Sequence, residues 1–186
     1  MIILKYIRAM KVIEPGQDWK IAALRSSFHV HFLFGGNMNL KYLDLAFEYA
    51  EKAFKCNEVP IGAVIVKNDE VIACAYNMKE KNNCCLDHAE LLVIREVSKI
   101  LNNWRLDDCD LYVTLDPCPM CASAIKQARI KNVYSALNNS DSNNLNILHS
   151  IFDINDHTNN SVNFISNLAV DKSKKILNDF FDLQRK

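Results

Sequence analysis

Apolar residues recur with a helical period from Met38 onward. In the stretch NLKYLDLAFEYAEKAFK, residues 39–55, they return every three or four positions, which predicts an amphipathic helix. The next stretch, IGAVIVKNDEVIACAYN at residues 61–77, has two apolar runs around the turn-forming pair Asn68-Asp69 and predicts a β-hairpin. A helix followed by paired strands indicates elements that share one core.

Beyond the hairpin, predicted helices and strands alternate. Helices are predicted at 87–101, 118–130 and 170–185, and strands at 110–115, 131–136 and 161–165. Residues 138–160 are rich in Asn, Ser and Asp, which predicts loops around one short helix near 145–151. This alternation favours a layered α/β domain over a helical bundle or a β-sandwich.

Residues 1–37 follow a different pattern. They show no clear period and end in the aromatic stretch FHVHFLFGGN. We therefore expect residues 1–37 to be an extension that is either not part of the native protein or disordered, with Met38 as the better start. Residues 38–186 are expected to form a single domain.

Composition narrows the setting of this domain. The formal net charge is zero, so no overall basic excess indicates nucleic-acid binding, although a local basic patch stays compatible with it. The longest uncharged run, residues 26–40, is too short for a helix to span a bilayer, so no membrane association is expected. Seven cysteines without a signal peptide favour reduced thiols and a cytoplasmic protein.

The stretch PCPMC, residues 117–121, offers a pair of thiols. Cys118 and Cys121 are three positions apart and would share one face of a helix. Pro119 is tolerated only in the first turn, so the helix is expected to begin at about Cys118. A helix N-terminus stabilises thiolates, which suits a metal site and a redox pair equally.

The stretch DHAE, residues 87–90, favours the metal. His88 and Glu90 converge only if His88 lies in the turn that opens a helix and Glu90 in its first turn. His88, Cys118 and Cys121 would then give zinc three ligands and leave a fourth position open, as in catalytic sites. Glu90 could carry protons beside the metal. The combination H-x-E with P-C-x-x-C is typical of zinc-dependent nucleobase deaminases.

Residues 39–186 resemble the bacterial tRNA-specific adenosine deaminases, within the cytidine deaminase-like superfamily. The resemblance lies in EVPIGAVIV, HAE, WRLDDCDLYVTLDPCPMCASAI and the late DFF, at residues 58–66, 88–90, 104–125 and 179–181. It implies a three-layer α/β/α fold with a central five-stranded mixed sheet, and a homodimer. It also implies conversion of adenosine to inosine at the wobble position, 34, of a tRNA anticodon stem-loop, chiefly that of an arginine tRNA.

The resemblance also implies residue roles. His88, Cys118 and Cys121 would bind one Zn²⁺ per subunit, and Glu90 would be the catalytic proton shuttle. The implied substrate-binding residues are Asn77, Val59, Ala89 through its backbone N–H, Leu115, Phe180, Phe181 and Arg185. Core packing would equally explain Val59 and Leu115, and at least one of the adjacent phenylalanines is expected to pack inward.

Two stretches depart from this family's pattern. The family has a Pro-Thr-Ala run before the zinc histidine, where this chain has CCLD at 84–87. The family also has a Gly-Ala-Arg-Asp stretch that meets RNA, where this chain has SALNNSDS at 135–142, with Asn139 in place of the aspartate. Two other functions therefore stay open: a small-molecule deaminase acting on guanine, cytosine or a pterin-like ring, and a non-catalytic zinc-bearing RNA-binding subunit.

Overall fold

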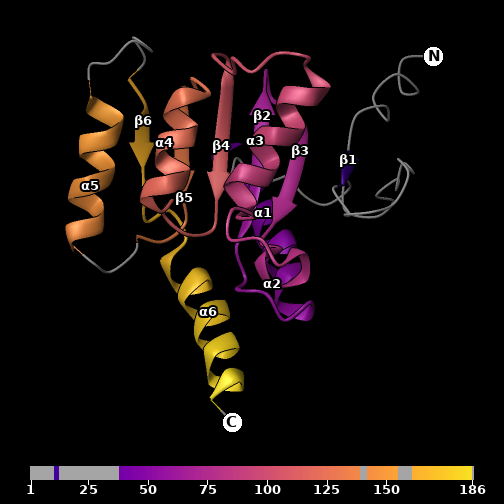
Figure 1. Ribbon diagram of the computed structural model, residues 1–186. Coiled ribbons are helices and arrows are strands. Elements are labelled where there is room, and N and C mark those ends of the chain that lie inside the picture. Colours follow the sequence, from indigo (N-terminus) through magenta and orange to yellow (C-terminus); the bar gives the residue numbers. More distant parts are fainter. Residues whose placement is uncertain (1–10, 13–37, 139–141, 155–160, 186) are drawn as a thin grey trace.

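The computed structural model describes residues 11–12, 38–138, 142–154 and 161–185. Most of the predicted extension, and Asn139, lie outside these described residues. A single mixed sheet forms the centre of the fold, in the strand order β1-β3-β2-β4-β5-β6 (Figure 1). The strands are β1 (Lys11–Val12), β2 (Gly62–Lys67), β3 (Glu70–Tyr76), β4 (Cys109–Val113), β5 (Asn132–Ser135) and β6 (Asn163–Ile165).

The five strands predicted between residues 61 and 165 are confirmed as β2 to β6. β2 pairs antiparallel with β3 and β4, whereas β4, β5 and β6 run parallel. The predicted turn at Asn68 and Asp69 is formed by two residues with positive φ, as a tight hairpin requires. The two-residue strand β1 adds a sixth member, parallel to β3 at the edge of the sheet.

The helices confirm the predicted pattern with shifted ends. They are α1 (Met38–Lys55), α2 (Lys79–Asn82), α3 (Ala89–Ile100), α4 (Pro119–Gln127), α5 (Ser142–Asp153) and α6 (Val170–Gln184). α4 ends before the predicted boundary because Arg129 takes a positive φ of 62°. α5 is longer than the short helix predicted there. The sequence did not predict α2, which has four residues, none of them buried.

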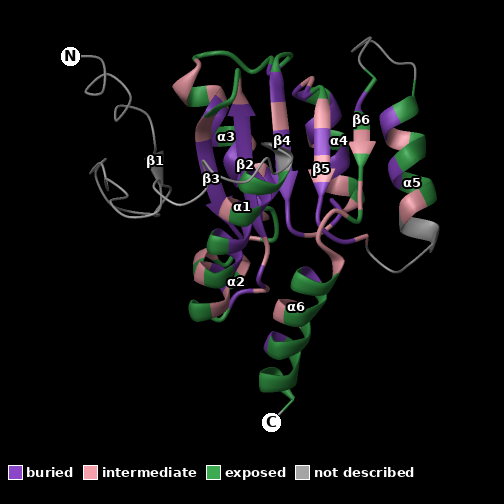
Figure 2. Cartoon of the chain, turned by 180° about the vertical axis from the view of Figure 1, so that it is seen from behind, coloured by how far each residue is buried: buried purple, intermediate pink, exposed green. Residues whose placement is uncertain are grey.

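Helices cover both faces of the sheet and so confirm the three-layer prediction. Figure 1 shows α3 and α4 on one face, and Figure 2, seen from behind, shows α1 on the other. The core between them contains fully buried side chains from all layers, including Leu43, Ile65, Leu111 and Ile125. Burying these apolar surfaces is the main free-energy gain that holds the layers together.

Gly62 marks the closest contact between α1 and the sheet. A Cβ atom at this position would lie 2.0 Å from the backbone oxygen of Ala46 and 2.7 Å from the backbone nitrogen of Ala50. Neither backbone atom can yield, so only glycine fits between β2 and α1. Within the described residues, no helix is long and apolar enough to cross a membrane.

Candidate metal centre and active site

The N-termini of α3 and α4 bring three potential metal ligands together. His88 caps α3, Cys118 caps α4 with Pro119 at the start of the helix, and Cys121 lies in the first turn of α4. These positions confirm the predicted starts of both helices. The chain reaches them through loops that follow β3 and β4, which are separated in the sheet by β2 alone.

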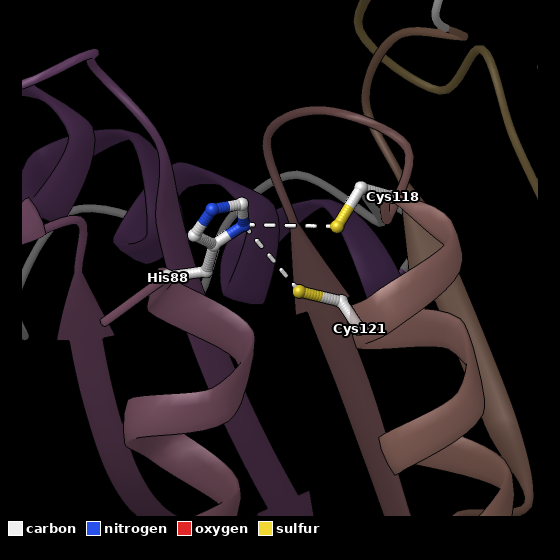
Figure 3. A group of neighbouring side chains, drawn as sticks. All are labelled: His88, Cys118 and Cys121. Atoms are coloured by element: carbon white, nitrogen blue, oxygen red, sulfur yellow. Dashed lines mark hydrogen bonds between the residues drawn. The ribbon is translucent and has the colours of Figure 1, made fainter. Parts of the chain in front are cut away.

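The distances fit a zinc ion. His88 Nδ1 lies 3.7 Å from Cys118 Sγ and 3.5 Å from Cys121 Sγ (Figure 3). Zinc–nitrogen and zinc–sulfur bonds of about 2.0 and 2.3 Å at a tetrahedral angle would separate these atoms by about 3.5 Å. All three ligand atoms lie within 4.8 Å of one another. One imidazole and two sulfurs at this spacing could hold a metal ion with an open fourth position.

Proton sharing inside the cluster also suits a cation. A hydrogen bond from Cys121 lowers the pKa of the Cys118 thiol to about 4. The pKa of Cys121 is raised, because its thiol donates to Cys118 and is buried. The hydrogen bond to Cys118 raises the pKa of His88. The Cys118 thiolate therefore accepts hydrogen bonds from Cys121 and His88, and a bound metal ion would take the place of these protons.

Glu90 lies in the first turn of α3 beside this cluster. Its side chain is 3% exposed, and Oε2 has no hydrogen-bond partner among the described residues. Burial raises the pKa of Glu90 to about 7, with a smaller contribution from the charge of Cys118. A buried carboxyl with a free oxygen and a pKa near neutrality can both accept and release a proton, as general acid–base chemistry requires.

Asn77 organises the loop that carries His88. Its Oδ1 accepts the backbone N–H of Ala89 at 2.9 Å in a buried hydrogen bond. The Ala89 N–H, which the resemblance assigns to the base, thus has an internal acceptor here. The same loop is closed by Met78, whose N–H donates to the Asp87 carbonyl oxygen at 3.0 Å. Asn77 therefore ties the end of β3 to the start of α3.

Asp87, one of the departures from the family pattern, contacts α2 and α3. Its Oδ2 accepts from Asn82 Nδ2 at 2.6 Å, and its Oδ1 lies 3.9 Å from a guanidinium nitrogen of Arg95. The carboxylate is buried, so these two partners offset part of the cost of taking it out of water. Asp87 thus helps to fold the stretch that precedes His88.

The sequence did not predict a role for Glu58. Its carboxylate is 1% exposed and accepts the backbone N–H groups of Glu80 at 3.2 Å and Lys81 at 2.7 Å. These bonds satisfy the N-terminus of α2, which has no side-chain cap of its own. A glutamate directly before a buried apolar strand is the one sequence signal that could have indicated this role.

Three predicted substrate residues line one pocket of about 340 Å³. Its walls are Asn57, Glu58, Val59, Asn77, Lys79, Glu80, Phe180 and Gln184. Val59 is half-buried, Asn77 belongs to the loop of His88, and Phe180 comes from α6. The structure thus brings residues 59, 77 and 180 together across more than 100 positions of sequence.

The other predicted substrate residues lie apart from this pocket's walls. Leu115 is half-buried in the turn between β4 and Cys118, because β4 ends at Val113. Phe180 is 6% exposed and contacts Phe54, whereas Phe181 is 42% exposed, which confirms that one of the pair packs inward. Arg185 caps the end of α6 and lies 3.5 Å from Asp182.

Comparisons with known proteins agree on one family. The family model of MafB19-like deaminases matches residues 37–185. The tRNA-specific adenosine deaminase of Bacillus subtilis is 50% identical over 92 residues, which make up 50% of this chain and 57% of that relative. The chain thus matches little more than half the length of this curated relative.

Two solved structures extend the likeness to the fold. One, from a study of A-to-I editing by tRNA:A34 deaminases at the wobble position of transfer RNA, superposes with a TM-score of 0.67 at 35% identity. It covers 74% of this chain and 99% of its own. The other is guanine deaminase from Bacillus subtilis, with a TM-score of 0.53 at 37% identity, covering 58% of this chain and 69% of its own.

Proposed function

The chain belongs to the MafB19-like deaminase family, and we propose that it converts adenosine to inosine at the wobble position of a tRNA, chiefly an arginine tRNA. One observation carries the proposal: a buried carboxyl, Glu90, with a free oxygen beside the cluster of His88, Cys118 and Cys121. The tRNA substrate is supported by the likeness to tRNA adenosine deaminases.

His88, Cys118 and Cys121 would hold one Zn²⁺ per subunit. When bound there, zinc would supply Lewis acidity, which lowers the pKa of a water molecule at the open fourth position. Two thiolates and a neutral imidazole would cancel the charge of the ion, so a separate base is needed close by. Glu90 fills that role without being a ligand.

Glu90 moves protons through the whole reaction. It takes a proton from the attacking water and delivers it to N1 of adenine, while the water oxygen bonds to C6. Glu90 then takes the remaining proton from the hydroxyl on C6 and gives it to the amino group, and the C6–N6 bond breaks as the C6 carbonyl forms and ammonia leaves. Water and adenosine thereby yield inosine and ammonia. Burial suits Glu90 to this work because it brings the pKa close to neutrality.

The pocket lined by Val59, Asn77 and Phe180 would receive the flipped nucleotide. Asn77 and Val59, which line the pocket, would contact the adenosine. The resemblance adds Leu115 and the Ala89 N–H to the base site, and the Ala89 N–H would have to exchange its bond to Asn77 Oδ1 for one to the base. Exposed Phe181 and Arg185 on α6 would stack on and contact the anticodon loop. Because bases of a single-stranded loop are already partly unstacked, flipping one into the pocket costs less free energy than in a duplex.

The proposal also covers the domain bounds, the cellular location and the oligomeric state. We assign the activity to residues 38–186, with residues 1–37 as a non-native extension, and expect a cytoplasmic homodimer. Sedimentation equilibrium of the zinc-loaded protein measures the assembly directly. A monomer at micromolar concentration contradicts the homodimer.

The test of function is mass spectrometry of RNA hairpins incubated with the zinc-loaded protein. One hairpin carries an arginine anticodon loop with adenosine at the wobble position, and its control carries guanosine there. The proposal predicts a gain of one mass unit on the first hairpin alone. Ammonia release from free guanine, without any change in the RNA, would instead favour the guanine deaminase function suggested by the second structural likeness.

A further inference from the structure

Helix α6 is joined to the sheet by a short junction, residues 166–169. The backbone N–H of Leu168 donates to the Ser135 oxygen at 3.1 Å, and that of Ala169 donates to the Ala136 oxygen at 2.9 Å. Asn167 Oδ1 accepts the Asn138 N–H at 3.1 Å. The junction is therefore hydrogen-bonded to the chain at the end of β5.

Two serine hydroxyls connect this region to the chain that leads into the metal cluster. Ser166 Oγ donates to Asp116 Oδ1 at 2.6 Å, and Ser173 Oγ donates to the Thr114 carbonyl oxygen at 2.6 Å. Asp116 is 5% exposed and stands two residues before Cys118. A short hydroxyl–carboxylate bond is charge-assisted and roughly twice as strong as a neutral one.

The remaining contacts of α6 lie along its own length. Within α6, the buried residues are Ser173 and Phe180. A groove of about 360 Å³ separates much of the helix from α1. The ion pair of Lys172 with Asp44 spans this region at 2.7 Å, but both side chains are at least half exposed, so water screens it. The direction of α6 thus depends on its first turn, on the junction before it, and on the contacts of Phe180 with Phe54 and of Gln184 with Asn57 near its end.

We propose that Ser166 is a positioning residue that sets α6, and with it Phe180, against the metal-bearing end of the fold. The inference rests on the proposed function, because the bond between Ser166 and Asp116 affects RNA binding only if the protein acts on RNA. Asp116 precedes Cys118, so the same carboxylate fixes the end of the ligand loop and the start of the RNA-facing helix. Figure 1 shows α6 projecting away from the sheet.

The test variant is Ser166→Ala in the full-length, zinc-loaded protein. Loss of the hydroxyl should raise KM for the adenosine hairpin about tenfold, the size expected for one hydrogen bond to a carboxylate. It should leave kcat and zinc content unchanged. Hydrogen exchange of the α6 backbone amides, measured without RNA, should become about tenfold faster for the same reason. Ser166→Thr keeps a hydroxyl and should restore both values.

The matched control is Ser150→Ala, which removes an exposed hydroxyl bonded to the Asn146 oxygen inside α5. It should change neither KM nor exchange in α6. Unchanged α6 exchange and KM in Ser166→Ala overturn the inference, and so does a fall in kcat that accompanies zinc loss. If wild-type protein alters no hairpin, the proposed function fails. The exchange experiment still decides the role of Ser166, because it uses no substrate.

Discussion

The metal cluster and helix α6 are built differently. Cys121, Ala89 and Glu90 are almost fully buried. They lie in the first turns of α3 and α4, which pack on one face of the sheet. Helix α6 projects from the sheet, and most of its residues are exposed. A rigid centre suits chemistry that needs fixed ligand positions, whereas an exposed helix suits recognition of a large polymer.

This comparison predicts that changes at the cluster abolish activity, whereas changes on α6 alter substrate binding. The largest effect is expected for Cys121→Ala, because two remaining ligands cannot hold zinc tightly. Zinc measured by plasma mass spectrometry should fall from about one ion per chain to near zero, with activity at background. Cys109→Ala, which changes a buried thiol on β4, is the control and should retain zinc. Full zinc in Cys121→Ala contradicts the ligand assignment.

Glu90→Gln separates proton transfer from metal binding. The amide keeps the shape of the side chain but cannot accept the proton, so kcat should fall by about 10²–10⁴-fold with zinc retained. Glu96→Gln is a matched control on the same helix, because Glu96 is also buried and has one oxygen without a partner among the described residues. Steady-state deamination of the hairpin measures both. Substantial turnover by Glu90→Gln would exclude the proton-shuttle role.

Gly62→Ala tests the scaffold that supports both regions. The new methyl group would overlap the α1 backbone at Ala46, and relieving the overlap should cost about 3 kcal/mol of unfolding free energy. Urea denaturation followed by circular dichroism measures the loss. An unchanged midpoint would mean that α1 can move away from β2 without penalty.

Phe181→Ala should have the smallest effect and should act on binding alone. Phe181 is exposed, and loss of a stacked base costs about 1–3 kcal/mol, so KM for the hairpin should rise about tenfold without loss of thermal stability. Leu183→Ala, an exposed apolar residue on the same helix, is the control and should leave KM unchanged. Equal effects of the two variants would remove the case for stacking by Phe181.

Most of the fold followed from residue patterns. Apolar repeats predicted most of the strands and helices, since most of these elements bury an apolar face, although β6 buries none of its three residues. The sequence did not predict α2 because none of its four residues is buried, so the helix has no apolar pattern. Its N-terminus is satisfied instead by Glu58, more than 20 residues earlier in the chain.

The sequence by itself determined the ligand types and their local geometry, because helix starts at His88 and Cys118 follow from neighbouring residues. Only the tertiary structure decided which distant groups meet. It joined His88 to the two cysteines across β2, paired Asn77 with Ala89, and linked Ser166 to Asp116 over 50 residues. Local backbone preferences reach about one helical turn, whereas these contacts depend on how the layers pack.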